Sequence, residues 1–116
     1  MKRSIFLFVL FGSVGLFMGV SVSAKPGRCL LVIDGKTYIS GRCDVDVYTD
    51  GTGSFQITEN RKNGAYFAQV LVDRPNLATG YWNAERGANH AHDPLGELKR
   101  KGACWENKKA RVCAWK

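Results

Sequence analysis

The feature that most constrains the fold is a pair of cysteines near the end of the chain, Cys104 and Cys113. A hairpin that turns over residues 107–110 would place these two cysteines opposite each other, within reach of a disulfide. The same register forms one apolar pair and one ion pair, each worth roughly 0.2–1 kcal/mol: Trp105 with Val112, and Glu106 with Arg111. This stretch predicts a disulfide-stapled, cationic hairpin that closes the domain.

The start of the chain has the three-part layout of a secretory signal peptide. Two basic residues precede an apolar run from Ile5 to Val22, and small residues through Ala24 form a cleavage site. An uncleaved anchor is the alternative, because the run is almost long enough to span a bilayer. We expect cleavage, since glycines and serines interrupt the run. Residues 1–24 are then the signal peptide, residues 25–116 form a single β domain, and the protein is periplasmic or secreted.

All four cysteines lie in the mature part of the chain, Cys29, Cys43, Cys104 and Cys113. An even number of cysteines in a small exported protein indicates two disulfides. Three connectivities are possible, and we favour pairing the first two and the last two because each bond closes a local loop. Each would contribute about 3 kcal/mol in the chain-entropy model. A four-cysteine zinc site is disfavoured, because the sequence lacks any C-x-x-C spacing.

Short apolar stretches separated by turn signals follow the first cysteine. Asp34-Gly35 is the strongest hairpin signal, because this pair suits a type I′ turn, and the resulting register places Cys29 opposite Ser40. A second hairpin is expected from residues 44–48 and 54–58. Its alternation points four apolar residues inward: Val45, Val47, Phe55 and Ile57.

Two further strands are expected at residues 65–72 and 78–83. Residues 84–101 are expected to be irregular, because Pro94 and Gly96 break the only regular pattern there. Six to eight short strands with almost no helix indicate an all-β fold, a small antiparallel β-barrel or sandwich with two disulfides. The last hairpin could close or cover the edge of such a sheet.

Positive charge is concentrated at the end of the chain. Without Lys2 and Arg3, fifteen basic and ten acidic side chains give a net charge of +5, and residues 99–116 hold seven of the basic and only one of the acidic ones. Such a patch attracts anionic partners, although solubility alone is an alternative explanation. The candidate binding residues are Lys99, Arg100, Lys101, Lys108, Lys109, Arg111 and Trp115.

The two histidines suggest a weaker hypothesis. His90 and His92 stand two residues apart beside Asp93, so an extended chain would present both imidazoles on one face as possible metal ligands. A surface loop ordered by side-chain to backbone hydrogen bonds is the simpler interpretation. No catalytic motif is apparent, since the cysteines are expected to be oxidised and a small β fold leaves little room for a substrate cleft.

Three segments of the chain form a recognisable set: residues 80–83, residues 89–96, and the GACW and ARVCAW sequences of residues 102–105 and 110–115. Together they resemble a family of small, exported, uncharacterised proteobacterial proteins. The resemblance covers roughly residues 29–116 and is most specific at the final cysteine hairpin. It implies a periplasmic or secreted bacterial protein. In architecture alone, the chain is also similar to the periplasmic lysozyme inhibitors, which are small disulfide-bonded β-barrels.

The sequence therefore predicts a non-enzymatic exported domain without a cofactor. We expect it to bind an anionic envelope polymer, a membrane surface or a protein partner through the basic C-terminal hairpin, with no specific binding of nucleic acid. Inhibition of lysozyme or another host hydrolase, as a protective or virulence factor, is the first alternative. A small metal-binding protein that uses His90 and His92 is the second.

Overall fold

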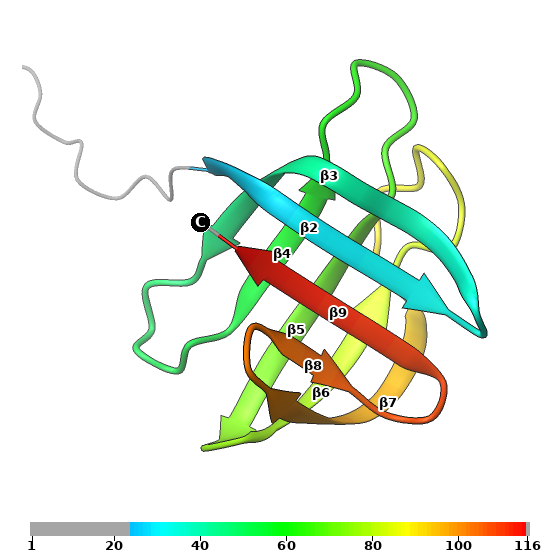
Figure 1. The fold of residues 1–116 in the computed structure, drawn as a ribbon. Helices are drawn as coiled ribbons and strands as arrows, with labels where there is room; N and C mark the ends of the chain where they lie inside the picture. The colour runs from blue at the N-terminus through cyan, green and yellow to red at the C-terminus, as the bar shows by residue number, and fades with distance from the viewer. Residues whose placement is uncertain (1–23, 116) are drawn as a thin grey trace, which may run out of the picture.

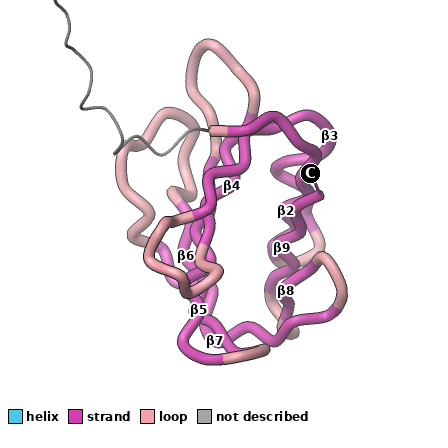
Figure 2. The backbone as a smooth tube through the Cα atoms, turned by 90° about the vertical axis from the view of Figure 1, so that its left-hand side faces the viewer, coloured by secondary structure: helices cyan, strands magenta, loops and turns pink. Residues whose placement is uncertain are grey.

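Eight antiparallel strands close into a barrel in the computed structural model, which describes residues 24–115 (Figure 1). Each strand pairs with its neighbours in sequence, and the last strand returns to pair with the first, so the strands form a complete ring (Figure 2). The strands are β2 (Lys25–Ile33), β3 (Lys36–Val47), β4 (Phe55–Glu59), β5 (Phe67–Arg74), β6 (Leu77–Trp82), β7 (Asp93–Lys101), β8 (Cys104–Glu106) and β9 (Ala110–Trp115).

The barrel confirms the predicted fold class, and both favoured disulfides are present. The predicted signal peptide lies outside the described residues except for Ala24. Within residues 24–115, no helix is long and apolar enough to cross a bilayer.

The first hairpin turns at Asp-Gly, as predicted, with φ angles of 51° and 81° at the two turn residues. A register shift adds one residue to β3, so Cys29 lies opposite Gly41. The predicted register, with Cys29 opposite Ser40, is therefore wrong because a β-bulge intervenes. The shift turns Cys43 toward the interior, where it forms a disulfide with Cys29.

Strand β7 corrects the expectation of an irregular segment over residues 84–101. Residues 84–92 do form a loop, but Asp93–Lys101 is a strand that pairs with β6. The strand continues through the expected break because Gly96 adopts a φ of 86° at an irregularity in the pairing. Glycine adopts this conformation without a steric penalty.

The side chain of Asn107 supports the bulged part of β7. Its amide nitrogen donates to the carbonyls of Leu95 and Glu97 at 2.8 and 2.9 Å. The neighbouring strand β8 has only three residues and begins to pair with β7 at Lys99. The Asn107 amide therefore satisfies carbonyl groups that β8 is too short to reach.

The last hairpin has the predicted register. Cys104 lies opposite Cys113, with the two Cα atoms 4.0 Å apart, and the apolar pair and the ion pair both form. Because Trp105 and Val112 point into the barrel, the disulfide between their neighbours lies on the outer side of the sheet. The predicted edge closure is also confirmed, since β9 pairs with β2.

Apolar side chains on alternate positions fill the interior of the barrel. At the end near the Asp-Gly turn, three aromatic rings pack together with centroids 4.6–5.9 Å apart: Tyr38, Tyr66 and Trp82. Arg86 lies over the Tyr66 ring and forms an ion pair with Glu59 at 2.6 Å. We call this the closed end. The opposite end, with the β3–β4, β5–β6 and β7–β8 connections, is the mouth.

Candidate binding surfaces

Six residues from distant parts of the sequence point outward on one side of the barrel. This side is formed by β2, β9 and β8, with β3 and β7 at its margins (Figure 1). The strand neighbours of these residues include Cys29, Leu98 and Val112, which are buried in the interior, so alternation directs the six to the exterior. We call them the basic face: Arg28, Arg42, Lys99, Lys101, Arg111 and Trp115.

The pairing of β9, β2 and β3 sets one edge of the basic face. Arg28 lies opposite Trp115 on one side and opposite Arg42 on the other. Side chains directly opposite in antiparallel strands have Cβ atoms about 4.5–5.5 Å apart. Trp115 is also 44% exposed. An accessible aromatic ring therefore lies beside Arg28, and Arg42 lies on the other side of Arg28.

The pairing of β7, β8 and β9 supplies the other cations. Lys99 lies opposite Glu106, which in turn lies opposite Arg111 and forms an ion pair with it at 3.2 Å. Lys101 lies opposite one cysteine of the outer disulfide. Among residues 24–115, Arg111 is the only cation of the basic face in an ion pair. Its remaining four cations are free to contact a partner.

Three of the predicted binding residues lie outside the basic face. Lys108 and Lys109 occupy the β8–β9 turn at its closed-end margin, where the Asp34 N–H donates to the Lys109 carbonyl at 2.8 Å. Arg100 alternates with Lys99 and Lys101, so its side chain goes to the opposite side of β7. The structure therefore separates Arg100 from its two basic neighbours.

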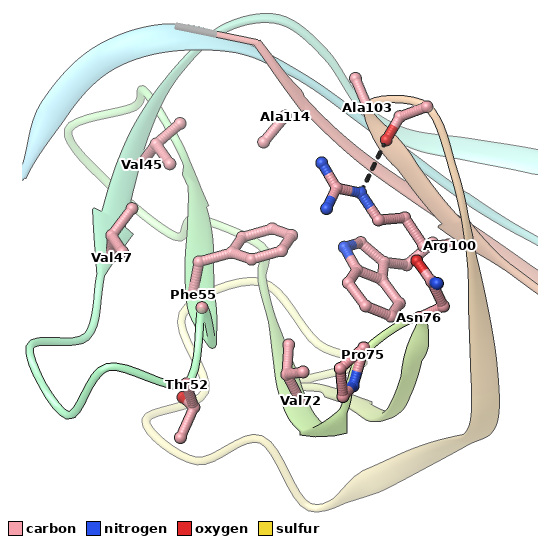
Figure 3. Close-up of a pocket in the computed structure, with 13 residues that line it drawn as sticks. Val45, Val47, Thr52, Phe55, Val72, Pro75, Asn76, Arg100, Ala103 and Ala114 are labelled. Carbon is pink, nitrogen blue, oxygen red and sulfur yellow. Dashed lines mark hydrogen bonds between the residues drawn. The ribbon is translucent and has the colours of Figure 1, made fainter.

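The mouth of the barrel contains a cavity of about 380 Å³ that we did not predict (Figure 3). Its walls expose somewhat more apolar than polar surface, and Phe55 and Trp105 within it are buried. Val47 at the rim is 40% exposed, because the barrel interior is not filled at that level. The apolar lining consists of Val45, Val47, Phe55, Val72, Pro75, Ala103, Trp105 and Ala114.

Among residues 24–115, Arg100 is the only charged side chain that lines this cavity. Its Nε donates to the carbonyl of Gly102 at 3.2 Å, and its backbone N–H donates to the carbonyl of Asn76 at 3.3 Å. Figure 3 shows the guanidinium extending over the cavity. Within the described part of the chain, its two terminal nitrogens form no hydrogen bond. The cavity therefore combines apolar walls with one uncompensated positive charge.

Hydrogen bonds order the β3–β4 loop on the other side of the mouth. Asp50 accepts bonds from the hydroxyl and the backbone N–H of Thr52, at 2.7 and 3.0 Å, and these bonds lower the pKa of the Asp50 carboxyl. The buried Ser54 hydroxyl accepts a bond from the Val72 N–H at 2.8 Å. The loop is thereby tied to β5, which fixes this part of the rim.

The two histidines lie together in the β6–β7 loop. The rings of His90 and His92 are stacked, with centroids 5.0 Å apart and planes 8° apart. Both side chains are exposed, as is Asp93 at the start of β7. In the part of the chain that the structure describes, no three His, Cys, Asp or Glu side chains are placed to hold a metal ion. Among residues 24–115, the pair therefore has no further ligands that would complete a metal site.

The sequence indicated some of these residues but not their arrangement. Val45, Val47 and Phe55 face inward as predicted, with Val47 opposite Phe55. Alternation gives the side of the sheet on which a residue lies, but not whether the barrel is filled at that level. Arg28 and Arg42 were missed because their proximity to the last hairpin depends on the closure of the ring.

Comparisons of the chain with protein-family models, with curated proteins and with solved structures find no match. The two resemblances seen in the sequence therefore stay predictions. The case for a function rests on the surfaces of the barrel.

Proposed function

We propose that the protein is an exported, non-enzymatic binding protein that holds an anionic polymer or membrane surface on its basic face. One observation carries this proposal. The strand register gathers Arg28 and Arg42 from the first hairpin with Lys99, Lys101 and Arg111 from the last three strands. These cations occupy one side of a rigid barrel, next to an exposed tryptophan.

The size of the electrostatic attraction favours a partner with repeated charges. A lysine or arginine near an anionic membrane surface contributes about 1 kcal/mol. The four cations without an ion pair would then provide about 4 kcal/mol, which corresponds to a dissociation constant of only about 1 mM. A single small anion that touches one or two of these cations would bind more weakly still. A polymer or membrane with many phosphate or carboxylate groups can contact all four cations at once and so reaches the full value.

The two disulfides support an oxidising location for this activity. Both bonds are formed and the described residues contain no free cysteine. Such bonds persist in the periplasm and outside the cell, where anionic envelope polymers and lipid headgroups are accessible. We therefore place the proposed activity in the periplasm or in the secreted fraction.

Charge removal at the basic face tests the proposal. The variant Arg28→Gln, Arg42→Gln, Lys101→Gln removes three cations without altering the interior. Binding is measured by co-sedimentation with phosphatidylglycerol vesicles and, separately, with purified lipopolysaccharide, because these probes represent different sources of phosphate. We expect a loss of about 3 kcal/mol, or roughly a hundredfold, on the probe that represents the partner, and a strong decrease in wild-type binding with added salt.

A matched control variant has the same net charge as the basic-face variant but leaves the basic face intact. The variant Arg61→Gln, Lys62→Gln, Arg74→Gln changes three exposed cations outside this face. We expect it to bind within a few-fold of the wild type. Equal losses in both variants would mean that only net charge matters and would contradict the proposal. The proposal would also be rejected if the wild-type protein bound neither the vesicles nor the lipopolysaccharide at low salt.

A further inference from the structure

We propose that the mouth cavity is a second binding site, for a small organic anion with one carboxylate and an apolar body, such as a medium-chain fatty acid. This inference is independent of the basic face, because the cavity lies inside the ring of strands. Arg100 lines the cavity, whereas its neighbours on β7, Lys99 and Lys101, lie on the basic face.

The shape of the cavity fits a small molecule. Its volume of about 380 Å³ lies within the range of about 300–1,000 Å³ that is usual for ligand pockets. An eight-stranded barrel is also just wide enough to hold one small ligand when its interior is not completely filled. Here the aromatic cluster fills the closed end, and the unfilled space lies at the mouth. A ligand would therefore enter from the mouth with its apolar part first.

The walls specify an apolar body. Phe55 and Trp105 present buried aromatic surface, and Val45 and Val72 add aliphatic groups around them. Contact with such walls stabilises a ligand by about 25 cal/mol for each Å² of apolar surface removed from water. Val47, which is exposed in the free protein, would be covered by the part of the ligand nearest the rim.

The charge specifies one carboxylate. Among the described residues that line the cavity, Arg100 is the only cation and none is acidic, so nothing among them neutralises its charge. A guanidinium can donate two parallel hydrogen bonds to a carboxylate. A ligand with several phosphates would leave charges without a partner, because the cavity offers no second cation. The mouth therefore differs in selectivity from the basic face.

The site is largely preformed, which reduces the entropic cost of binding. The Nε of Arg100 is already bonded to the Gly102 carbonyl, so one edge of the guanidinium is held and the terminal nitrogens remain available. On the other side, the Thr52 and Ser54 hydroxyls share a hydrogen bond of 2.7 Å. A ligand would thus find both the cation and the opposite rim in place.

Titration with decanoate, and with 1-decanol as its uncharged counterpart, tests the site. Binding is followed by chemical-shift changes of backbone amides in the full mature chain. We expect saturable binding of decanoate with shifts concentrated around Val47, Phe55 and Arg100, and binding of 1-decanol that is roughly tenfold to a hundredfold weaker. Arg100→Gln should reduce the affinity for decanoate to that for 1-decanol. Arg100→Lys should retain most of it, because the charge remains.

Two further variants keep the test specific. Lys99→Gln removes a cation from the adjacent position on the outer side of β7 and should not change decanoate affinity. Val47→Phe fills the rim and should weaken decanoate and 1-decanol alike. The inference is rejected if decanoate does not bind saturably, if 1-decanol binds equally well, or if Arg100→Gln and Lys99→Gln have the same effect. It is also rejected if Val47→Phe leaves binding unchanged.

Discussion

At the scale of single residues, the buried side chain of Asn83 organises the loop that follows β6. Its Oδ1 accepts a hydrogen bond from the Phe67 N–H at 3.0 Å, and its Nδ2 donates to the carbonyls of Ala65, Glu85 and Ala88 at 2.9–3.2 Å. This one amide connects the end of β6 to the loops on either side. The sequence shows only an asparagine at the end of an apolar stretch.

Replacement of Asn83 by aspartate should destabilise the protein strongly. The carboxylate would direct an oxygen at three carbonyl oxygens in a buried site, so the hydrogen bonds that the two N–H groups of the amide share among them would be lost. We expect a decrease of roughly 2–3 kcal/mol in the free energy of unfolding, measured by urea denaturation at neutral pH. Asn89→Asp makes the same charge change at an exposed position and is the control. A similar stability of both variants would contradict the role assigned to Asn83.

Replacing either of two aspartates by asparagine should change stability at pH 7, in opposite directions. Partial burial, together with the nearby charge of Asp44, raises the pKa of Asp46, so its ionised form is disfavoured in the folded protein. Asp46→Asn should therefore stabilise the protein at pH 7. The difference from the wild type should disappear as the pH falls below the pKa of the unfolded chain. Thermal unfolding of the variant and the wild type at pH 7 and at pH 3 measures the stability difference at each pH.

Asp50 has the opposite sign, because hydrogen bonds from Thr52 lower its pKa in the folded state. Its contribution to stability is present above the unfolded pKa and is lost as the pH falls through the folded pKa. Asp50→Asn should therefore destabilise the protein near neutral pH and have no effect in acid. If the two variants shifted the melting temperature in the same direction at pH 7, the assigned causes would be wrong.

At the scale of elements, the last hairpin depends on its disulfide more than the first hairpin does. Strand β8 has three residues, whereas β2 and β3 have nine and twelve. Such a short strand offers few ladder hydrogen bonds, so the covalent bond between Cys104 and Cys113 holds it against β9. If β8 were displaced, both β7 and β9 would have an unpaired edge.

Replacement of Cys104 and Cys113 by alanine should reduce stability by about 3 kcal/mol, the value expected for a loop of this length. The loss of protection should first affect the strands next to the missing disulfide, before the whole barrel is affected. We expect faster amide hydrogen exchange in β8 and β9 than in β4 and β5, measured under native conditions. The wild type under oxidising conditions is the reference. Equal acceleration in all strands would show that the disulfide stabilises the barrel only as a whole.

The same scale explains which elements were predictable. The Asp-Gly turn and the cysteine hairpin are each defined by a few adjacent residues. Local chemistry was sufficient to predict the turn in the first case and the turn with its full register in the second. Strand β7 was missed because the irregularity at Gly96 interrupts the alternation that marks a strand, and because the strand is supported by its partners: β6 on one side, and β8 with the Asn107 amide on the other. The bulge in the first hairpin was missed because nothing in the adjacent sequence marks the added residue.

At the scale of the whole molecule, closure of the ring creates both candidate sites. Pairing of β9 with β2 brings Trp115 beside Arg28, and the complete ring encloses the cavity at the mouth. Arg28 and Trp115 lie more than eighty positions apart in the sequence. Composition predicted a surplus of cations near the C-terminus, and alternation predicted inward-facing valines. Neither could show that Arg100 turns into the mouth while two arginines from the first hairpin join the outer face.

Gly27 provides a direct test of this closure. A Cβ atom at this position would lie 2.5 Å from the backbone oxygen of Trp115 and 3.1 Å from Cγ2 of Val45, so the chain tolerates no side chain where β2 meets the end of β9. Gly27→Ala should therefore force the two strands apart and reduce stability by about 1–3 kcal/mol. Ser40→Ala, at an exposed position of β3, is the control for an ordinary surface change.

The location of the damage distinguishes closure from general instability. Because the clash involves the backbone of Trp115, amide exchange should accelerate first along β9 and the adjoining part of β2, while the β4–β5 pair stays protected. Loss of this pairing should also separate Trp115 from Arg28 and weaken binding of anionic vesicles, even where the barrel remains folded. A Gly27→Ala protein with wild-type stability and unchanged exchange in β9 would show that the ring does not close between these two strands.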